Sequence, residues 1–227
     1  VSPTFPPEEQ ATARELTREL GVTHVEVDSQ ELESEGYASN QGDRCYFCKD
    51  ELFALAQEEA DRRGIPWVLD GTITDDLGAH RPGLKAASER RVRHPLVEAG
   101  FDKAMVRDLA QAYGLPVWDK PSFACLGSRF PVGTRVTADR VGRIQRVESA
   151  LRLMGFGQLR ARWHELDGQP MIRIELDGES IQRATEPGLR EAILDVCTAE
   201  GFAWVTLDLK GYQSGVLSLA GSDSAIA

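Results

Sequence analysis

The stretch of residues 48–72, CKDELFALAQEEADRRGIPWVLDGT, contains the two patterns on which the expected fold depends. Its first part reads as a helix that ends at Gly64, and glycine often follows a helix because it readily adopts the left-handed conformation. Its second part, residues 65–72, is a short apolar run, which is typical of a strand buried in a parallel sheet. The stretch therefore predicts a helix followed directly by a buried strand.

The same alternation continues on both sides of this stretch. Residues 7–21 and 101–114 each read as a helix that closes at a glycine, and Asp102 is suited to capping the second one. Strand-like segments follow these helices at residues 22–29 (VTHVEVDS) and 115–118 (LPVW). Helices that alternate with buried strands predict an α/β fold with a doubly wound parallel sheet.

The first residue already lies within this alternation. The chain opens with VSPTFPP, without an initiator methionine, and Val1 reads as the last residue of a strand. We therefore expect a strand-helix-strand pattern that is under way at residue 1, with part of the natural protein upstream.

A different pattern begins after Arg129. A long amphipathic helix, two strand-like runs around a DGQP turn, a second helix and a last strand are expected at residues 137–156, 158–166, 170–176, 187–202 and 203–209. This order predicts a smaller α+β domain. We therefore divide the chain into domains at residues 1–129 and 130–218, with a flexible tail at 219–227.

Composition limits the classes of function. The chain has 227 residues and a net charge of −10, which argues against broad, nonspecific binding to nucleic acid. No apolar run is long enough to span a bilayer and no leader precedes the first residues, so we expect no membrane contact and a cytoplasmic location. In a reducing compartment the four cysteines favour free thiols, a metal or catalysis over disulfides.

The cysteines are the strongest chemical signal. Cys45 and Cys48 follow a polar, loop-like segment, and this spacing lets two thiolates converge on one metal atom from a helix start. The pair is compatible with a redox pair, half a zinc site or part of an iron-sulfur site. Cys197 lies on the apolar side of its predicted helix and is interpreted as a core residue. His24, His80, His94 and His164 show no metal-ligand spacing.

A third cysteine narrows the alternatives. Cys125 lies in residues 119–137, DKPSFACLGSRFPVGTRVT, where prolines and glycines predict a loop that presents Cys125, Ser128 and Arg129 together. Three thiolates can hold a cubane cluster and leave one iron open, whereas electron-transfer clusters usually have all four positions filled. An open iron can bind an extra sulfide or a substrate atom, so sulfur delivery is a plausible activity.

Several separated motifs resemble one family, and together they span nearly the whole chain. The motifs are RCYFCK (44–49), LDGT (69–72), RPGLKAASE (81–89), KPSFACLGSRFPVG (120–133) and VTLDLKGYQSG (205–215). They look like the LarE family of ATP-dependent sulfur transferases, which make the nickel-pincer nucleotide cofactor of lactate racemase. The resemblance implies the PP-loop ATP pyrophosphatase fold, which is adenine nucleotide alpha hydrolase-like.

The resemblance also implies a reaction and a sulfur source. ATP and Mg would adenylate a carboxylate of pyridinium-3,5-biscarboxylic acid mononucleotide, and sulfur would then displace AMP to give a thiocarboxylate. Some members sacrifice the sulfur of one cysteine, whereas others carry a 4Fe-4S cluster on three cysteines that passes on an additional sulfide. Cys45, Cys48 and Cys125 match the cluster type, and Cys125 lies in the loop of the sacrificial cysteine. The family further implies a homo-oligomer, a hexamer, and leaves the sulfide donor open.

Candidate site residues follow from chemistry and from the motifs. Arg129, Arg160 and Arg162 are expected to grip the phosphate or carboxylates of the substrate, and Arg160 and Arg162 share a strand face, for which a solvated face is the alternative. Other expected substrate contacts are Ser128 and Glu175, the latter also as a metal contact. Asp70, Gly71 and Thr72 are expected near the nucleotide, beyond the carboxyl end of a strand, unless they form a simple turn. Arg81 and Lys85 are expected to face the nucleotide or the substrate, and the alternative is that both are solvated.

One family motif is absent from the sequence. The SGGxDS loop, whose backbone amides cradle pyrophosphate, is expected with its strand upstream of Val1. Two other functions stay open. A PP-loop tRNA thiolation enzyme should carry a basic surface or an RNA-binding domain. A zinc-stabilised, non-catalytic binding module would use Cys45, Cys48, Cys125 and Cys197 as ligands.

Overall fold

The computed structural model describes residues 1–77, 81–121 and 123–213. The chain divides into two compact units, Val1–Ala124 and Cys125–Ala227, and each is described by itself. The division lies before the boundary expected after Arg129, so Cys125, Ser128 and Arg129 belong to the second unit. The expected tail, 219–227, lies outside the described residues.

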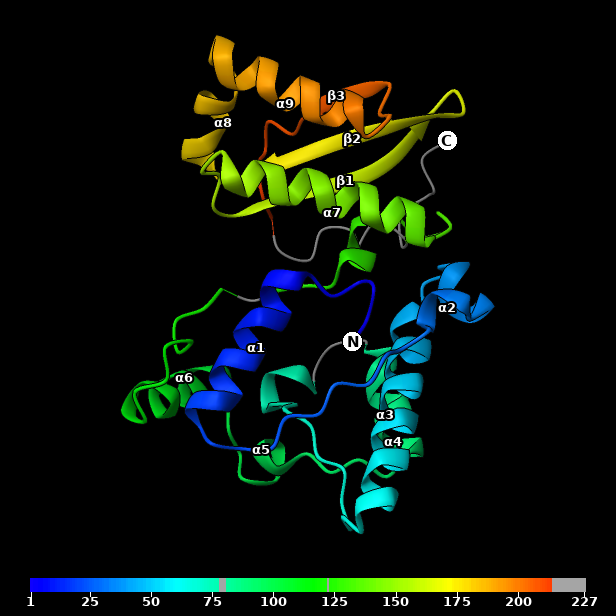
Figure 1. The fold of residues 1–227 in the computed structure, drawn as a ribbon, viewed down its shortest axis with the longest axis vertical. Coiled ribbons are helices and arrows are strands. Elements are labelled where there is room, and N and C mark those ends of the chain that lie inside the picture. Colours follow the sequence, from blue (N-terminus) through cyan, green and yellow to red (C-terminus); the bar gives the residue numbers. More distant parts are fainter. Residues whose placement is uncertain (78–80, 122, 214–227) are drawn as a thin grey trace. The chain divides into compact units, whose positions relative to one another are not determined.

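The first unit is built mainly from helices (Figure 1). Its α-helices are α1 (Pro7–Glu19), α2 (Glu35–Ala38), α3 (Arg44–Arg63), α4 (Pro82–Glu89), α5 (Pro95–Glu98) and α6 (Lys103–Ala112), with 3₁₀ helices η1 (Glu31–Glu33) and η2 (Thr74–Asp76). The three helices expected in this part of the chain are confirmed as α1, α3 and α6. Asp102 caps α6 as predicted, because its side chain accepts a hydrogen bond of 2.8 Å from the Met105 amide.

Helix α3 starts earlier than the sequence suggested. It begins at Arg44, so Cys45 and Cys48 lie inside its first turns and not in the loop before it. Helix α4 lies beside α3 (Figure 1), and Gly83 permits the close approach. A Cβ atom at Gly83 would lie 2.9 Å from Cγ of Lys49 and 3.5 Å from the Cys45 carbonyl oxygen. The glycine of the RPG motif therefore lets α4 approach the turn that carries the cysteines.

The parallel sheet expected in this unit is not formed among its described residues. The strand-like residues 23–28 and 65–68 are not strands, and one isolated parallel bridge joins Leu69 to Arg93. Apolar side chains of both segments line a cavity of about 470 Å³ instead, among them Val25, Val27 and Trp67. Among the described residues, the backbones of these two segments form no strand pair. The doubly wound sheet therefore stays a prediction.

The second unit is a three-stranded sheet with helices, as the sequence predicted. Its elements are η3 (Leu126–Arg129), α7 (Ala138–Leu153), β1 (Leu159–Leu166), β2 (Gln169–Leu176), α8 (Gly178–Ala184), α9 (Pro187–Ala199) and β3 (Trp204–Leu207). The strand order is β1-β2-β3, with β1 antiparallel and β3 parallel to β2. The chain as a whole is thus a mixed α/β protein. In the part of the chain that the structure describes, the search for membrane spans finds no sufficiently long apolar helix.

The core of the second unit lies between the sheet and its helices. Helix α7 packs on β1 and on α9, and its buried face includes Ile144 and Leu151. Trp163 of β1 is 1% exposed, stacks on the Phe130 ring and makes an edge-to-face contact with the Phe202 ring. Cys197 of α9 is fully buried, which confirms its interpretation as a core residue.

Candidate functional site

The two faces of β1 differ in chemistry. Leu159, Ala161 and Trp163 point into the core, whereas Arg160 and Arg162 alternate with them on the opposite face. Both arginines are nevertheless buried, with 7% and 5% of their surface exposed. The prediction that they share a face is confirmed, and the alternative of a solvated face is wrong. A buried guanidinium needs polar partners, so its neighbours define the site.

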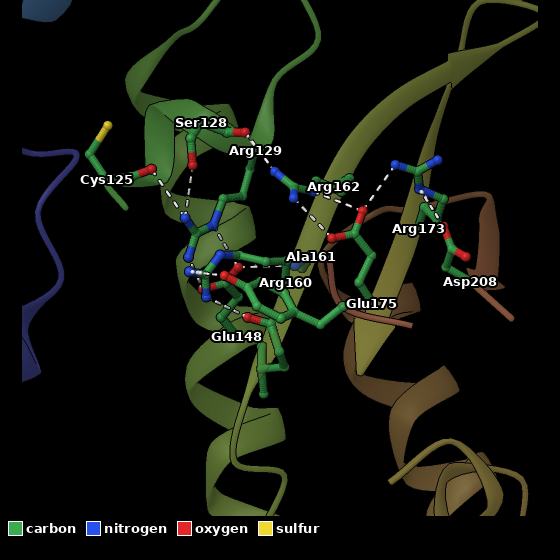
Figure 2. Close-up of polar contacts among 12 residues, drawn as sticks. Cys125, Ser128, Arg129, Glu148, Arg160, Ala161, Arg162, Arg173, Glu175 and Asp208 are labelled. Carbon is green, nitrogen blue, oxygen red and sulfur yellow. Dashed lines mark hydrogen bonds and ion pairs between the residues drawn. The ribbon is translucent and has the colours of Figure 1, made fainter. Parts of the chain in front are cut away.

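Arg129 is held by a glutamate that the sequence analysis did not single out. Its Nε and Nη2 donate to the two carboxylate oxygens of Glu148 at 2.8 and 2.9 Å, and both side chains are 0% exposed. Its Nη1 donates to the Cys125 carbonyl oxygen at 3.2 Å and to Oγ of Ser128 at 3.0 Å (Figure 2). The guanidinium therefore ties the Cys125 loop to α7.

Glu148 is also a partner of two other groups. It accepts hydrogen bonds from the Ala161 amide and from Arg152, each at 3.0 Å. Burial acts to raise the pKa of Glu148, but the charge and hydrogen bonds of Arg129, with the Ala161 amide and Arg152, outweigh it and lower that pKa. The carboxylate is therefore ionised at neutral pH and balances the Arg129 charge.

A second ion pair fixes the same loop to the sheet. Arg162 donates from Nε and Nη2 to the Glu175 carboxylate at 3.0 and 2.9 Å, and from Nη1 to the Ser128 carbonyl oxygen at 2.8 Å. Arg173 donates to the same glutamate at 3.0 Å. The structure thus brings together the predicted residues Ser128, Arg129, Arg162 and Glu175.

Arg160 has a different kind of neighbour. Its Nη1 donates to the Leu159 carbonyl oxygen at 2.8 Å and its Nη2 to the Tyr212 hydroxyl at 3.3 Å. The guanidinium carbon also lies 4.9 Å from the centre of the Tyr212 ring. Burial and the charge of Arg129 lower the pKa of Arg160, although an arginine stays protonated at neutral pH. An anionic ligand would relieve this repulsion.

His164 is the next residue on this face of β1. Its Nε2 atom is buried and has no hydrogen-bond partner among the described residues. Burial, followed by the charge of Arg173, lowers the pKa of His164. The imidazole is therefore neutral at pH 7.

The residues that are expected to bind the nucleotide lie in the first unit. Asp70 accepts hydrogen bonds from the Thr72 amide at 3.0 Å and from the Thr72 hydroxyl at 2.9 Å, and it contacts Nδ1 of His94 at 2.6 Å. Burial opposes ionisation of Asp70, but the hydrogen bonds from His94 and Thr72 lower its pKa. Gly71 lies in this turn. Arg81 pairs with Asp76 of η2 at 2.8 Å.

Lys85 lies on the exposed side of α4. Its ammonium group is 5.2 Å from the centre of the Tyr46 ring and 3.8 Å from the Glu89 carboxylate. Because its side chain is 72% exposed, it is available to a ligand but is not positioned by burial.

The cysteines are reduced and differ in exposure. Cys45 is exposed and Cys48 is partly exposed, and both lie in the first turns of α3. Cys125 is partly exposed, and Figure 2 shows its carbonyl oxygen turned toward Arg129 and its Sγ turned away. Three accessible thiols fit the donor chemistry of an iron-sulfur cluster. Within each unit's described residues, no cluster of three or more His, Cys, Asp or Glu forms a metal site.

Three residues of these networks were missed by sequence reasoning. Glu148 interrupts the buried stripe of α7, and a charged residue among Ile144, Val147 and Leu151 was a usable signal. His94 carried no signal, because its partner Asp70 is 24 residues away. Tyr212 lies in the VTLDLKGYQSG motif, and the motif by itself indicates no role for this residue.

Buried arginines beside a cysteine-bearing loop suit the binding of an anionic small molecule. Comparison with curated proteins supports a more specific class. A pyridinium-3,5-bisthiocarboxylic acid mononucleotide synthase from Lactiplantibacillus plantarum is 36% identical over 214 residues, 94% of this chain and 75% of the relative. The chain therefore belongs to the LarE family.

Two further relatives carry no functional name. An uncharacterised protein from Synechocystis is 41% identical over 96% of this chain and 80% of its own length. Another, from Methanocaldococcus jannaschii, is 27% identical over 77% of this chain and 66% of its own length. The search of family models found no match.

Proposed function

We propose that the protein is an ATP-dependent sulfur transferase that converts a carboxylate of pyridinium-3,5-biscarboxylic acid mononucleotide into a thiocarboxylate. The observation that carries this proposal is the anchoring of the Cys125 loop by Arg129 and Arg162, in a member of the LarE family. The anchoring places a sulfur-bearing loop on a scaffold of cations, which suits a substrate with a phosphate and two carboxylates.

The proposed reaction has two steps. A substrate carboxylate oxygen attacks the α-phosphorus of ATP and releases pyrophosphate, with Mg²⁺ balancing the phosphate charge. A sulfide or thiolate sulfur then attacks the carbonyl carbon of the acyl adenylate, and AMP leaves with the electron pair of the broken C–O bond. The chain's own contribution is to bind and orient the reactants and to exclude water.

The second unit is proposed to bind the substrate. Arg160 and Arg162 would contact its phosphate or carboxylates, with Ser128 as a hydroxyl donor and Glu175 holding Arg162 in position. Arg129 is fully buried and grips Glu148, so we assign it to positioning the loop.

The first unit is proposed to bind ATP. Asp70, Gly71 and Thr72 form an ordered turn suited to a nucleotide, and Arg81 and Lys85 supply nearby cationic side chains. We propose that this unit belongs to a domain with the PP-loop, doubly wound sheet. Two observations support this: the cavity lining and the backbone of Val1, which pairs with Val27 and accepts from the Ser29 amide at 3.1 Å, as parallel strands do.

Cys45, Cys48 and Cys125 are proposed to hold a 4Fe-4S cluster. When bound, the cluster would supply an additional sulfide that the protein can replace after each turnover. The alternative is transfer of the Cys125 sulfur itself, once per chain. Cys197 does not fit a four-cysteine zinc site, because burial raises the pKa of its thiol to about 12. Family membership and the charge of −10 favour the mononucleotide over tRNA.

Product analysis tests the activity. The full-length protein would be incubated anaerobically with the mononucleotide, ATP, Mg²⁺ and sulfide, and the products separated by mass spectrometry. We expect a thiocarboxylate and AMP, with more than tenfold less product from Arg162→Gln. Arg190→Gln is the matched control, because that side chain is 60% exposed on α9. Absence of a thiocarboxylate with the wild-type protein would refute the proposal.

Metal analysis tests the cluster separately. Anaerobically purified protein should contain iron and acid-labile sulfide at about four per chain, and both should be lost in Cys45→Ala. Retention of both in that variant would refute Cys45 as a ligand of the cluster, and their absence from the reconstituted wild type would leave Cys125 as the sulfur source. The hexameric assembly, the sulfide donor and the cytoplasmic location stay predictions.

A further inference from the structure

The turn after β3 belongs to the VTLDLKGYQSG motif, to which the reaction above assigns no role. Gly211 in this turn has φ of +72°, and a Cβ atom there would lie 2.7 Å from the Leu176 carbonyl oxygen. The Tyr212 amide donates to the same oxygen at 2.8 Å. The backbone is thus fixed to the end of β2, which directs the Tyr212 side chain.

Tyr212 meets Arg160 in two ways. Its hydroxyl accepts the hydrogen bond of 3.3 Å from Nη2, and its ring lies 4.9 Å below the guanidinium carbon. The first contact fixes the direction of one donor, and the second is a cation–π interaction that fixes the plane of the fork. A partly buried aromatic side chain with two torsions can do both with little loss of conformational entropy.

The chemistry of this support differs from that of the neighbouring arginines. Arg129 and Arg162 are each held by a bidentate carboxylate, which balances their charge. Tyr212 supports Arg160 with a ring and a hydroxyl, which carry no formal charge. The contact with Tyr212 therefore orients the Arg160 cation and itself adds no negative charge.

We propose that Tyr212 is a positioning residue that orients Arg160 toward an anionic oxygen of the mononucleotide, either its phosphate or a carboxylate. This inference rests on the proposed function for the identity of the ligand. The orientation of Arg160 itself is a property of the free protein and can be tested without the reaction.

Binding in two backgrounds tests the inference. Tyr212→Phe keeps the ring and removes the hydroxyl, whereas Tyr212→Leu removes both contacts. We expect the Kd for the mononucleotide to rise about threefold in the first variant and about tenfold or more in the second, in line with the strength of such contacts. In an Arg160→Met background, Tyr212→Leu should raise the Kd less than twofold, because the group it orients is absent.

A structural role would give a different result. It predicts the same rise in Kd with and without Arg160, and that outcome, or no rise at all, would overturn the inference. Tyr113→Leu is the matched control, because that side chain is 75% exposed in the first unit and should leave the Kd unchanged. NMR of the free protein gives the independent readout: the ring-current shift of the Arg160 side chain should persist in Tyr212→Phe and vanish in Tyr212→Leu.

The source of the anionic oxygen is separated with two probes. Inorganic phosphate and pyridine-3,5-dicarboxylate are titrated into the same variants, and the probe whose Kd rises in Tyr212→Leu identifies the group that Arg160 contacts. If the wild type binds phosphate but not the mononucleotide, the proposed function is wrong and the inference is judged on phosphate alone. If neither probe nor the mononucleotide responds to the Tyr212 variants, the inference is wrong.

Discussion

Replacing Glu148 by glutamine should destabilise the second unit strongly. The change keeps the shape of the side chain but removes the charge that balances Arg129, whose side chain is 0% exposed. Removing one partner of a buried ion pair costs about 3–5 kcal/mol, because the other charge stays buried without compensation. The Ala161 amide also depends on this carboxylate, at 3.0 Å. We expect a loss near the middle of that range, since the glutamine oxygen can still accept one of these hydrogen bonds.

Hydrogen exchange measures this loss in the right unit. The amides of β1, residues 159–166, should exchange about 10²–10³ times faster in Glu148→Gln, which corresponds to about 3–4 kcal/mol. Glu165→Gln is the control: its ion pair with Arg140 is exposed, with 45% of the glutamate side chain accessible, and should contribute about 0–1 kcal/mol. Equal effects of the two variants would refute the view that the buried pair holds the site together.

The pH dependence provides a second check on the same carboxylate. The pKa of Glu148 is lower in the folded state than its ordinary value near 4.5. Its stabilisation is therefore fully present above that ordinary value and is lost as the pH falls through the lowered folded pKa. The acid part of the stability curve should be flatter in Glu148→Gln than in the wild type.

The other predictions concern reactivity, pH and the turn after β3. Cys45 is exposed and should react with a maleimide within minutes in the apo protein. Cys197 is buried, and burial raises the pKa of its thiol to about 12, so it should react only after unfolding. Early labelling of Cys197, measured by peptide mass spectrometry, would contradict its place in the core. The folded-state pKa of His164 is lowered, so stability should be complete above its unfolded pKa of about 6.5 and decrease as the pH falls below it, by a few degrees in Tm. His164→Gln should remove this decrease, and an unchanged profile would exclude His164 as its source. Gly211→Ala should cost about 1–3 kcal/mol in urea unfolding, because of its φ of +72° and its contact with the Leu176 carbonyl; a neutral effect would show that the turn adapts.

Much of the fold could be predicted because local signals mark the helices. Gly64 marks the C-terminal end of α3, and Asp102 marks the N-terminal end of α6. The alternation of side chains in residues 158–166 predicted both β1 and the shared face of Arg160 and Arg162. These features depend on the steric and hydrogen-bonding properties of a few adjacent residues, so sequence alone is sufficient.

Features that depend on distant partners were harder to predict. The pairing of residues 65–70 depends on which backbone lies beside them, and a short apolar run carries no information about its neighbour. The start of α3 at Arg44 was missed because the preceding residues are polar and give no clear boundary. Glu148 was missed because its partner, Arg129, lies 19 residues away and only the folded unit brings the two together.

The origin of the product sulfur tests the central claim most directly. The full-length, cluster-reconstituted protein would receive the mononucleotide, ATP, Mg²⁺ and sulfide labelled with ³⁴S, and the thiocarboxylate would be counted per chain by mass spectrometry. The account predicts labelled product in excess of one molecule per chain, with Cys125 intact in the recovered protein. Unlabelled product limited to one per chain, with sulfur missing from Cys125, would contradict the cluster route, and no thiocarboxylate at all would contradict the function.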